Sequence, residues 1–264
     1  LWGAAAVGTT GLVLGDEAYL GLALDGLAGD RTSGGFLAQL SLLFAPSGYY
    51  IEGPYYHRFA LRPLLTSSEV LHTHRPDLNI YSYKDGVIGK TIKALLSTVY
   101  PDGSFPALND ASRTMGIHDE GVLLSAAVGH ARYGQDAAVP AIQALARQQG
   151  RVWVHPSAMS LAAAADALPA NAQPYWPSVE LNEGPAGDKG AQGFLRAKAA
   201  DGDITQVCMN YGQHGMDHGH FDTLGITLFS QGDEVLREYG FARWLNVEPK
   251  FGGRCLPENV SRAR

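Results

Sequence analysis

The sequence predicts an α+β fold of two domains: an α/α-toroid over residues 1–172, then an antiparallel β-sandwich over residues 178–264 that is incomplete in this chain. Three observations predict it. The first two thirds of the chain carry apolar residues at helical spacing, the segment NAQPYWP at residues 171–177 interrupts that pattern, and strand-like runs follow. Helices followed by antiparallel strands are typical of α+β proteins.

The helical part consists of short segments with clear stop signals. Pro54 suits the first turn of one helix, and Gly134 and Gly150 suit the ends of two others. Many short antiparallel helix pairs favour a toroid or a helical solenoid, and the absence of a clean repeat favours the toroid. The expected helices cover residues 2–14, 16–27, 34–43, 55–67, 90–99, 119–133, 137–149 and 157–167.

The last part of the chain alternates strand-like runs with Gly, Asp and Asn turns. Residues 231–233 (QGD) are typical of a hairpin turn. The expected strands cover residues 193–197, 204–209, 224–229 and 234–239. Four strands are too few for a sandwich, so we expect further strands outside this chain.

Composition narrows the classes of function. Of the 264 residues 45% are apolar, enough for a buried core, and the net charge of −6 gives no basic footprint for nucleic acid. The sequence contains no run of 18 apolar residues, so it predicts no membrane-spanning helix. The chain has only two cysteines, Cys208 and Cys255, so a framework of several disulfides is excluded, and one disulfide between them is possible. The chain starts without Met, and neither end resembles a tail, so we interpret it as part of a larger protein.

The densest group of reactive side chains is DHGHFD at residues 217–222. In a strand His218 and His220 would point to one face, and Asp222 or the later Glu238 would complete a metal site there. The sequence also allows a polar loop whose histidines bond to the backbone. The spacing of the two histidines is equally compatible with a metal-binding or catalytic site and with this structural alternative.

A second group, GYYIEGPYYHR at residues 48–58, combines four tyrosines with a carboxylate, a histidine and an arginine. A tyrosine beside a cation can act as a general acid or base. We expect half of the rings to pack in the core. Near the end of the chain Lys250, Arg254, Arg262 and Arg264 offer the local positive charge that an anionic polymer needs. No GxGxxG, Walker A or GxSxG pattern is present.

These motifs are specific enough for a resemblance. The chain resembles the alginate lyases of polysaccharide lyase family 17, within the heparinase II/III-like group. Four segments spread over most of the chain carry the resemblance: GYYIEGPYYHRF, HGMDHGHFDTL, EVLREYG and GGRCLPEN. The resemblance implies an α/α-toroid followed by an antiparallel β-sandwich. It also implies β-elimination on a uronate polymer, alginate or oligoalginate first, in the periplasm or outside the cell.

The resemblance assigns roles to particular residues. Tyr55 is the expected acid, Tyr56 is the alternative, and His218 lies in the substrate cleft. A structural zinc ion is expected on His220 and Glu238, with a third ligand beyond this chain. Contacts to the anionic polysaccharide are expected from Tyr50, Glu52, Arg58 and Arg254. A homodimer is compatible with the sequence.

Four departures from the family pattern stand out. The family's Asn-His pair lies upstream of Leu1, Phe59 and Cys255 stand where relatives usually have Tyr, and Glu238 stands where Asp is more usual. We therefore expect the isolated 264-residue chain to be inactive.

Three alternatives stay open. The first is a lyase of a heparin-like or hyaluronan-like polymer, and the second is a catalytically inactive carbohydrate-binding relative. The third is a glycoside hydrolase with Glu52 and Asp110 as its facing carboxylates.

Overall fold

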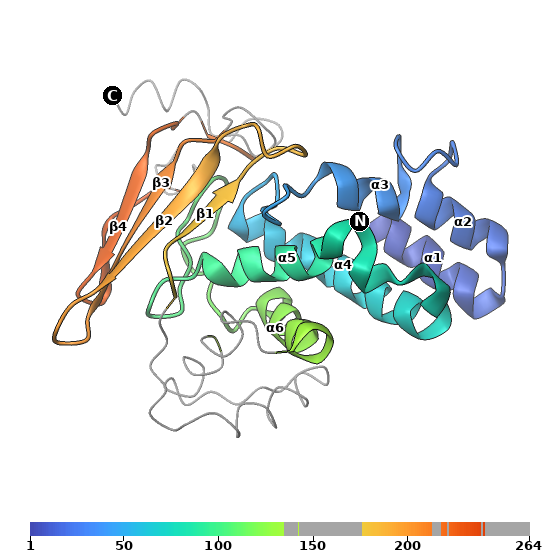
Figure 1. Cartoon of the computed structure of the whole chain (residues 1–264), viewed down its shortest axis with the longest axis horizontal. Helices are drawn as coiled ribbons and strands as arrows, with labels where there is room; N and C mark the ends of the chain where they lie inside the picture. Colours follow the sequence, from blue (N-terminus) through green and yellow to red (C-terminus); the bar gives the residue numbers. More distant parts are fainter. Residues whose placement is uncertain (135–141, 143–175, 213–217, 221, 239, 241–264) are drawn as a thin grey trace.

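The computed structural model describes residues 1–134, 142, 176–212, 218–220, 222–238 and 240. Helices come first, and an antiparallel sheet follows at one end of them (Figure 1), which confirms the predicted α+β class. The domain boundary predicted at residues 172–178 lies mostly outside the described residues. The elements are α1 (Trp2–Leu14), α2 (Glu17–Asp25), α3 (Gly35–Leu42), α4 (Pro54–His74), the 3₁₀ turns η1 (Pro76–Leu78) and η2 (Ile80–Ser82), α5 (Tyr83–Ser97), α6 (Glu120–Tyr133), β1 (Val179–Asn182), β2 (Ala191–Lys198), β3 (Ile204–Asn210), β4 (Ile226–Ser230) and β5 (Asp233–Leu236).

The predicted helices at residues 2–14, 16–27, 34–43 and 119–133 correspond to α1, α2, α3 and α6. The helices expected at 137–149 and 157–167 lie outside the described residues, apart from Ile142. No helix in the described ranges has both the length and the apolarity needed to cross a membrane.

Helices α4 and α5 are longer than the sequence predicted. We expected α4 to end near Ser67, but Ser68 donates its hydroxyl to the Leu64 carbonyl at 2.8 Å, and the helix continues to His74. A serine that bonds back to its own helix does not end it. At the start of α5, Lys84, Asp85 and Gly86 have positive φ, so the regular helix follows this kink.

The helical core lies between α3, α4, α5 and α6. Leu61, Leu64 and Leu65 of α4 and Leu95 and Leu96 of α5 are fully buried there. Burial of each such side chain stabilises the fold by about 1.5–3 kcal/mol. Tyr55 and Tyr56, in the first turn of α4, pack against this core.

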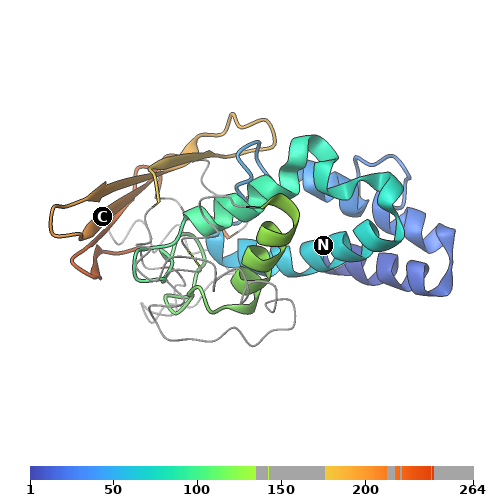
Figure 2. The ribbon, with the colours of Figure 1, turned by 60° about the horizontal axis from the view of Figure 1, so that its bottom comes forward.

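The sheet has the order β1-β2-β3-β4-β5, and all pairs are antiparallel. Strand β1 was not predicted, because four residues between loops carry too little alternation. The hairpin at residues 231–233 is present, and Gln231 and Gly232 both have positive φ, as a two-residue type I′ turn requires. The sheet and the α1–α2 pair lie at opposite ends of the molecule (Figure 2).

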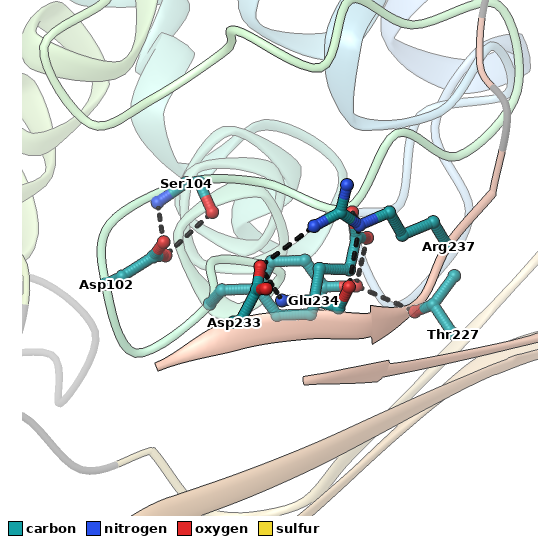
Figure 3. A network of polar contacts seen from close by, with 7 residues as sticks. Asp102, Ser104, Thr227, Asp233, Glu234 and Arg237 are labelled. Carbon is teal, nitrogen blue, oxygen red and sulfur yellow. Dashed lines mark hydrogen bonds and ion pairs between the residues drawn. The ribbon is translucent and has the colours of Figure 1, made fainter. Parts of the chain in front are cut away.

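The loop between α5 and α6 is fastened to the sheet by buried polar contacts. Tyr100 stacks on Phe229, with ring centroids 4.9 Å apart, and its hydroxyl is 2.8 Å from both Thr227 and Glu234. Figure 3 shows Thr227 and Glu234 in this network. Beside it, Arg196 of β2 donates to the carbonyls of Ser97 and Pro177. The site described next is formed where this loop meets the sheet.

Candidate active site and metal centre

The candidate site combines residues from three parts of the chain. The start of α4 supplies Tyr55 and Tyr56, and the α5–α6 loop supplies Asp110. The loop between β3 and β4 supplies His218, His220 and Asp222, and Glu238 follows β5. The site therefore depends on the contact between the helical part and the sheet.

Asp110 is the central contact of the two histidines. Its side chain has no exposed surface, and its two oxygens lie 3.2 Å from His218 Nδ1 and 3.2 Å from His220 Nε2. The Asp110 backbone N–H donates to the His218 carbonyl at 2.9 Å. Burial acts to raise the pKa of Asp110, but the bonds to both rings outweigh it, and the pKa lies below its usual value.

We expected the two histidines to share one face of a strand, and this expectation was wrong. Residues 218–220 are not in a strand, and His218 has a φ of 60°. Both rings reach the same carboxylate because the turn at His218 brings them around Asp110.

His220, Asp222 and Glu238 form a cluster that fits a metal ion. One ligand atom from each lies within 4.8 Å of the others. His220 Nδ1 is 3.3 Å from Glu238 Oε1, and two ligands of a tetrahedral zinc ion at about 2.0–2.1 Å lie roughly 3.3 Å apart. The donor set of one imidazole and two carboxylates suits zinc.

The electrostatics of this cluster also favour a cation. Burial raises the pKa of Asp222, and the nearby charge of Glu238 raises it further. Asn210 of β3 donates to Asp222 at 2.9 Å, and Gln192 of β2 donates to Asn210 at 2.8 Å. The sheet thus holds Asp222 in place, and a bound cation would relieve the repulsion between the two carboxylates.

The first turn of α4 places two tyrosines differently. The Tyr56 ring stacks on His218, with centroids 3.8 Å apart and planes inclined by 18°. The Tyr55 ring meets Tyr56 edge-on and lies 4.2 Å from the Arg58 guanidinium. Arg58 in turn pairs with Asp119 at 3.2 Å. Tyr56 is therefore a tyrosine in direct contact with a histidine of the site.

Two of the four tyrosines pack in the core, as expected for half of them. Tyr49 and Tyr50 are buried, and the Tyr50 ring packs against Phe44 and His57. Burial lowers the pKa of His57 to about 3, so this histidine is neutral. The expected substrate contacts of Tyr50 and of the half-buried Glu52 stay predictions.

Several predicted residues fall outside the described part of the chain: Lys250, Arg254, Cys255, Arg262 and Arg264. Cys208 is described, and it is a free, buried thiol. Phe59 is 45% exposed and packs against Trp2, with ring centroids 5.5 Å apart.

The sequence did not connect Asp110 with the two histidines. It offered Asp110 as a turn element or as one of two hydrolase carboxylates, whereas the structure places its carboxylate between His218 and His220. The useful signal was the turn-rich segment PALNDAS itself, because a loop between helices is where a scaffold presents functional groups.

Known proteins resemble this chain over its full length. Residues 181–261 match the family model described as heparinase II/III-like, C-terminal. An exo-oligoalginate lyase of Saccharophagus degradans is 36% identical, and an alginate lyase of Stenotrophomonas maltophilia is 38% identical, each over 100% of this chain. The chain spans 35% and 34% of these two relatives, about a third of their length.

A solved structure shares the fold. The crystal structure of a heparan sulfate lyase HepC mutant from Pedobacter heparinus matches 99% of this chain and 34% of its own, with a TM-score of 0.57. At 15% identity this likeness supports the fold alone.

Proposed function

We propose that this chain, whose residues 181–261 match the family model described as heparinase II/III-like, C-terminal, is part of a polysaccharide lyase that cleaves alginate or oligoalginate. The observation that carries the proposal is the stacked pair of Tyr56 and His218 beside the buried carboxylate of Asp110. A phenol and an imidazole in contact offer a proton donor and a proton acceptor at one place.

The reaction would be a β-elimination. The C5–H bond of a uronate breaks and its proton moves to His218, a double bond forms between C4 and C5, and the bond from C4 to the glycosidic oxygen breaks. Tyr56 gives the departing oxygen its proton. Arg58, with Arg254 from outside the described residues, would hold the uronate carboxylate by charge-assisted hydrogen bonds.

His220, Asp222 and Glu238 would hold a structural zinc ion. Such an ion would supply positive charge between two carboxylates and would join the end of β5 to the loop that carries His218. A periplasmic or extracellular location and a homodimer belong to the proposal without a structural observation of their own.

The test is ultraviolet absorbance of the intact protein with polymannuronate, since elimination leaves an unsaturated product. We expect absorbance to rise, and we expect His218→Gln to abolish the rise. Tyr19→Phe is a matched control, because Tyr19 is 47% exposed on α2, away from the site.

The other outcomes separate the alternatives. A rise with a heparin-like or hyaluronan-like polymer only would keep the mechanism and replace the substrate. Binding of uronate polymers without any rise would contradict the lyase proposal and indicate a carbohydrate-binding protein.

A further inference from the structure

Asp110 joins two sets of residues that the proposed function treats separately. It comes from the loop between α5 and α6, and its side chain is fully buried. One oxygen contacts His218, which stacks on Tyr56, and the other contacts His220, which belongs to the cation cluster. The Asp110 carboxylate thus lies between the Tyr56–His218 pair and the cluster of His220, Asp222 and Glu238.

The chemistry of a carboxylate restricts what these contacts can be. Ionised carboxylate oxygens only accept hydrogen bonds. At 3.2 Å each, the bonds therefore require a hydrogen on Nδ1 of His218 and a hydrogen on Nε2 of His220. The lone pair of a neutral ring then lies on the other nitrogen, Nε2 in His218 and Nδ1 in His220.

The cation cluster decides the state of the second nitrogen of His220. His220 Nδ1 faces Glu238 Oε1 at 3.3 Å, and without a cation this contact would call for a hydrogen on Nδ1 as well and a charged ring. A zinc ion held by His220, Asp222 and Glu238 would take the lone pair of Nδ1 and leave the hydrogen on Nε2. In metal sites a ligating imidazole usually donates its second N–H to a carboxylate or carbonyl, which fixes the tautomer. Asp110 stands in that place for His220.

We propose that Asp110 is a positioning residue that fixes opposite tautomers in the two histidines, Nδ1–H in His218 and Nε2–H in His220. Its catalytic meaning rests on the proposed function, because the lone pair at His218 Nε2 is the one that would accept the C5 proton. The tautomers themselves do not depend on any lyase activity.

Asp110→Asn is the informative substitution. It keeps the size of the side chain and the backbone hydrogen bond to the His218 carbonyl. An amide, however, has one acceptor oxygen and one NH₂ donor in place of two acceptors. Only one ring can keep its N–H bond to residue 110, so the other ring must change tautomer or turn away.

The primary measurement is the set of imidazole ¹⁵N chemical shifts of the intact, His-labelled and zinc-loaded protein at neutral pH. His218→Gln and His220→Gln spectra assign the two rings among the nine histidines of this chain. We expect Nδ1–H at His218 and Nε2–H at His220, and a changed pattern in one ring of Asp110→Asn. An Nε2–H tautomer at His218, or a ring protonated on both nitrogens, would overturn the proposal even if the variant does not fold.

Kinetics then test the consequence. We expect Asp110→Asn to lower kcat by about 10- to 100-fold with KM unchanged, the size of effect usual for a residue that orients a functional histidine. Asp102→Asn is the matched control, since Asp102 lies in the same loop and its side chain accepts hydrogen bonds from Ser104. Unchanged kcat and unchanged ring signals in Asp110→Asn would make Asp110 a loop anchor only.

The two proposals can fail independently. If the protein shows the expected tautomers but no activity on any uronate polymer, the lyase proposal is refuted and the role of Asp110 in orienting the rings stands. If it is active but His218 has the opposite tautomer, the lyase proposal stands and the role of Asp110 is refuted.

Discussion

The ring of His218 lies face to face with the ring of Tyr56, with centroids 3.8 Å apart. Tyr55, its neighbour in sequence, lies instead against the Arg58 guanidinium at 4.2 Å. The two tyrosines therefore differ in partner although both belong to the first turn of α4. This difference separates two candidate acids that the sequence left open.

We expect Tyr56→Phe to lower kcat by about 10²- to 10⁴-fold, the range for loss of a general acid. The substitution keeps the stacked ring and removes only the hydroxyl. Tyr55→Phe should cost less, because the Tyr55 ring lies against Arg58, whereas the Tyr56 ring stacks on His218. Initial rates of unsaturated-product formation measure both, and a larger loss in Tyr55→Phe would make Tyr55 the acid.

We expect Glu238→Gln to lower the zinc content and the Tm of the protein. The amide oxygen is a weaker ligand than the carboxylate that lies 3.3 Å from His220 Nδ1. An ion present at about 100 times its Kd stabilises a fold by roughly 2.7 kcal/mol. Metal analysis after gel filtration and thermal denaturation with and without a chelator measure both effects.

Asp201→Asn, in the exposed turn between β2 and β3, is the control for this experiment. A zinc content that is zero in the unsubstituted protein, or equal in Glu238→Gln, would show that the cluster does not hold zinc through Glu238.

The sequence predicted the elements better than the contacts between them. Apolar spacing and Gly or Pro stops located α1, α2, α3 and α6, because these signals act within one element. The ends of α4 and α5 were missed. Ser67 and Ser68 resemble a stop in sequence, yet they are buried within α4, and their burial is a tertiary effect.

The site shows the same limit. The pattern HGH predicted that two imidazoles lie together, but the partner that joins them, Asp110, is more than a hundred positions away. A single sequence carries no signal for such a contact. The same holds for Asn210, whose amide holds Asp222 at 2.9 Å.

The ion pair between Glu69 and Arg132 should make stability depend on pH. Arg132 donates to Glu69 through Nε at 2.7 Å and through a second nitrogen. These bonds, with the Tyr81 hydroxyl, hold the pKa of Glu69 below its ordinary value of 4.5 against the effect of burial. A depressed carboxyl pKa gives stability that is present above pH 4.5 and is lost as the pH falls through the folded-state pKa.

We therefore expect Glu69→Gln to lower the free energy of unfolding at pH 7 by about 1 kcal/mol, a small value because the carboxylate is 37% exposed and screened by water. The difference should shrink below pH 4.5. Urea denaturation at several pH values measures it. Glu17→Gln, whose side chain is 79% exposed, is the control, and a difference that grows toward acid would contradict the argument.

The site depends on the contact between the α5–α6 loop and the sheet, and a substitution of Tyr100 tests that contact. Its hydroxyl is 2.8 Å from both Thr227 and Glu234, and the Glu234 side chain is 15% exposed. Burial raises the pKa of Glu234, and the Tyr100 hydrogen bond opposes that rise. Tyr100→Phe would leave the carboxylate without this donor.

We expect Tyr100→Phe to lower the free energy of unfolding by about 1–3 kcal/mol at neutral pH, the range for a buried group that loses its hydrogen bond. The loss should be smaller in acid, because a protonated Glu234 needs no donor. Tyr211→Phe is the matched control, since its hydroxyl also contacts a carboxylate, that of Glu180, but on the surface. Equal losses in the two variants would mean that the Tyr100 contact does not hold the loop to the sheet, and the geometry around Asp110 would then need another support.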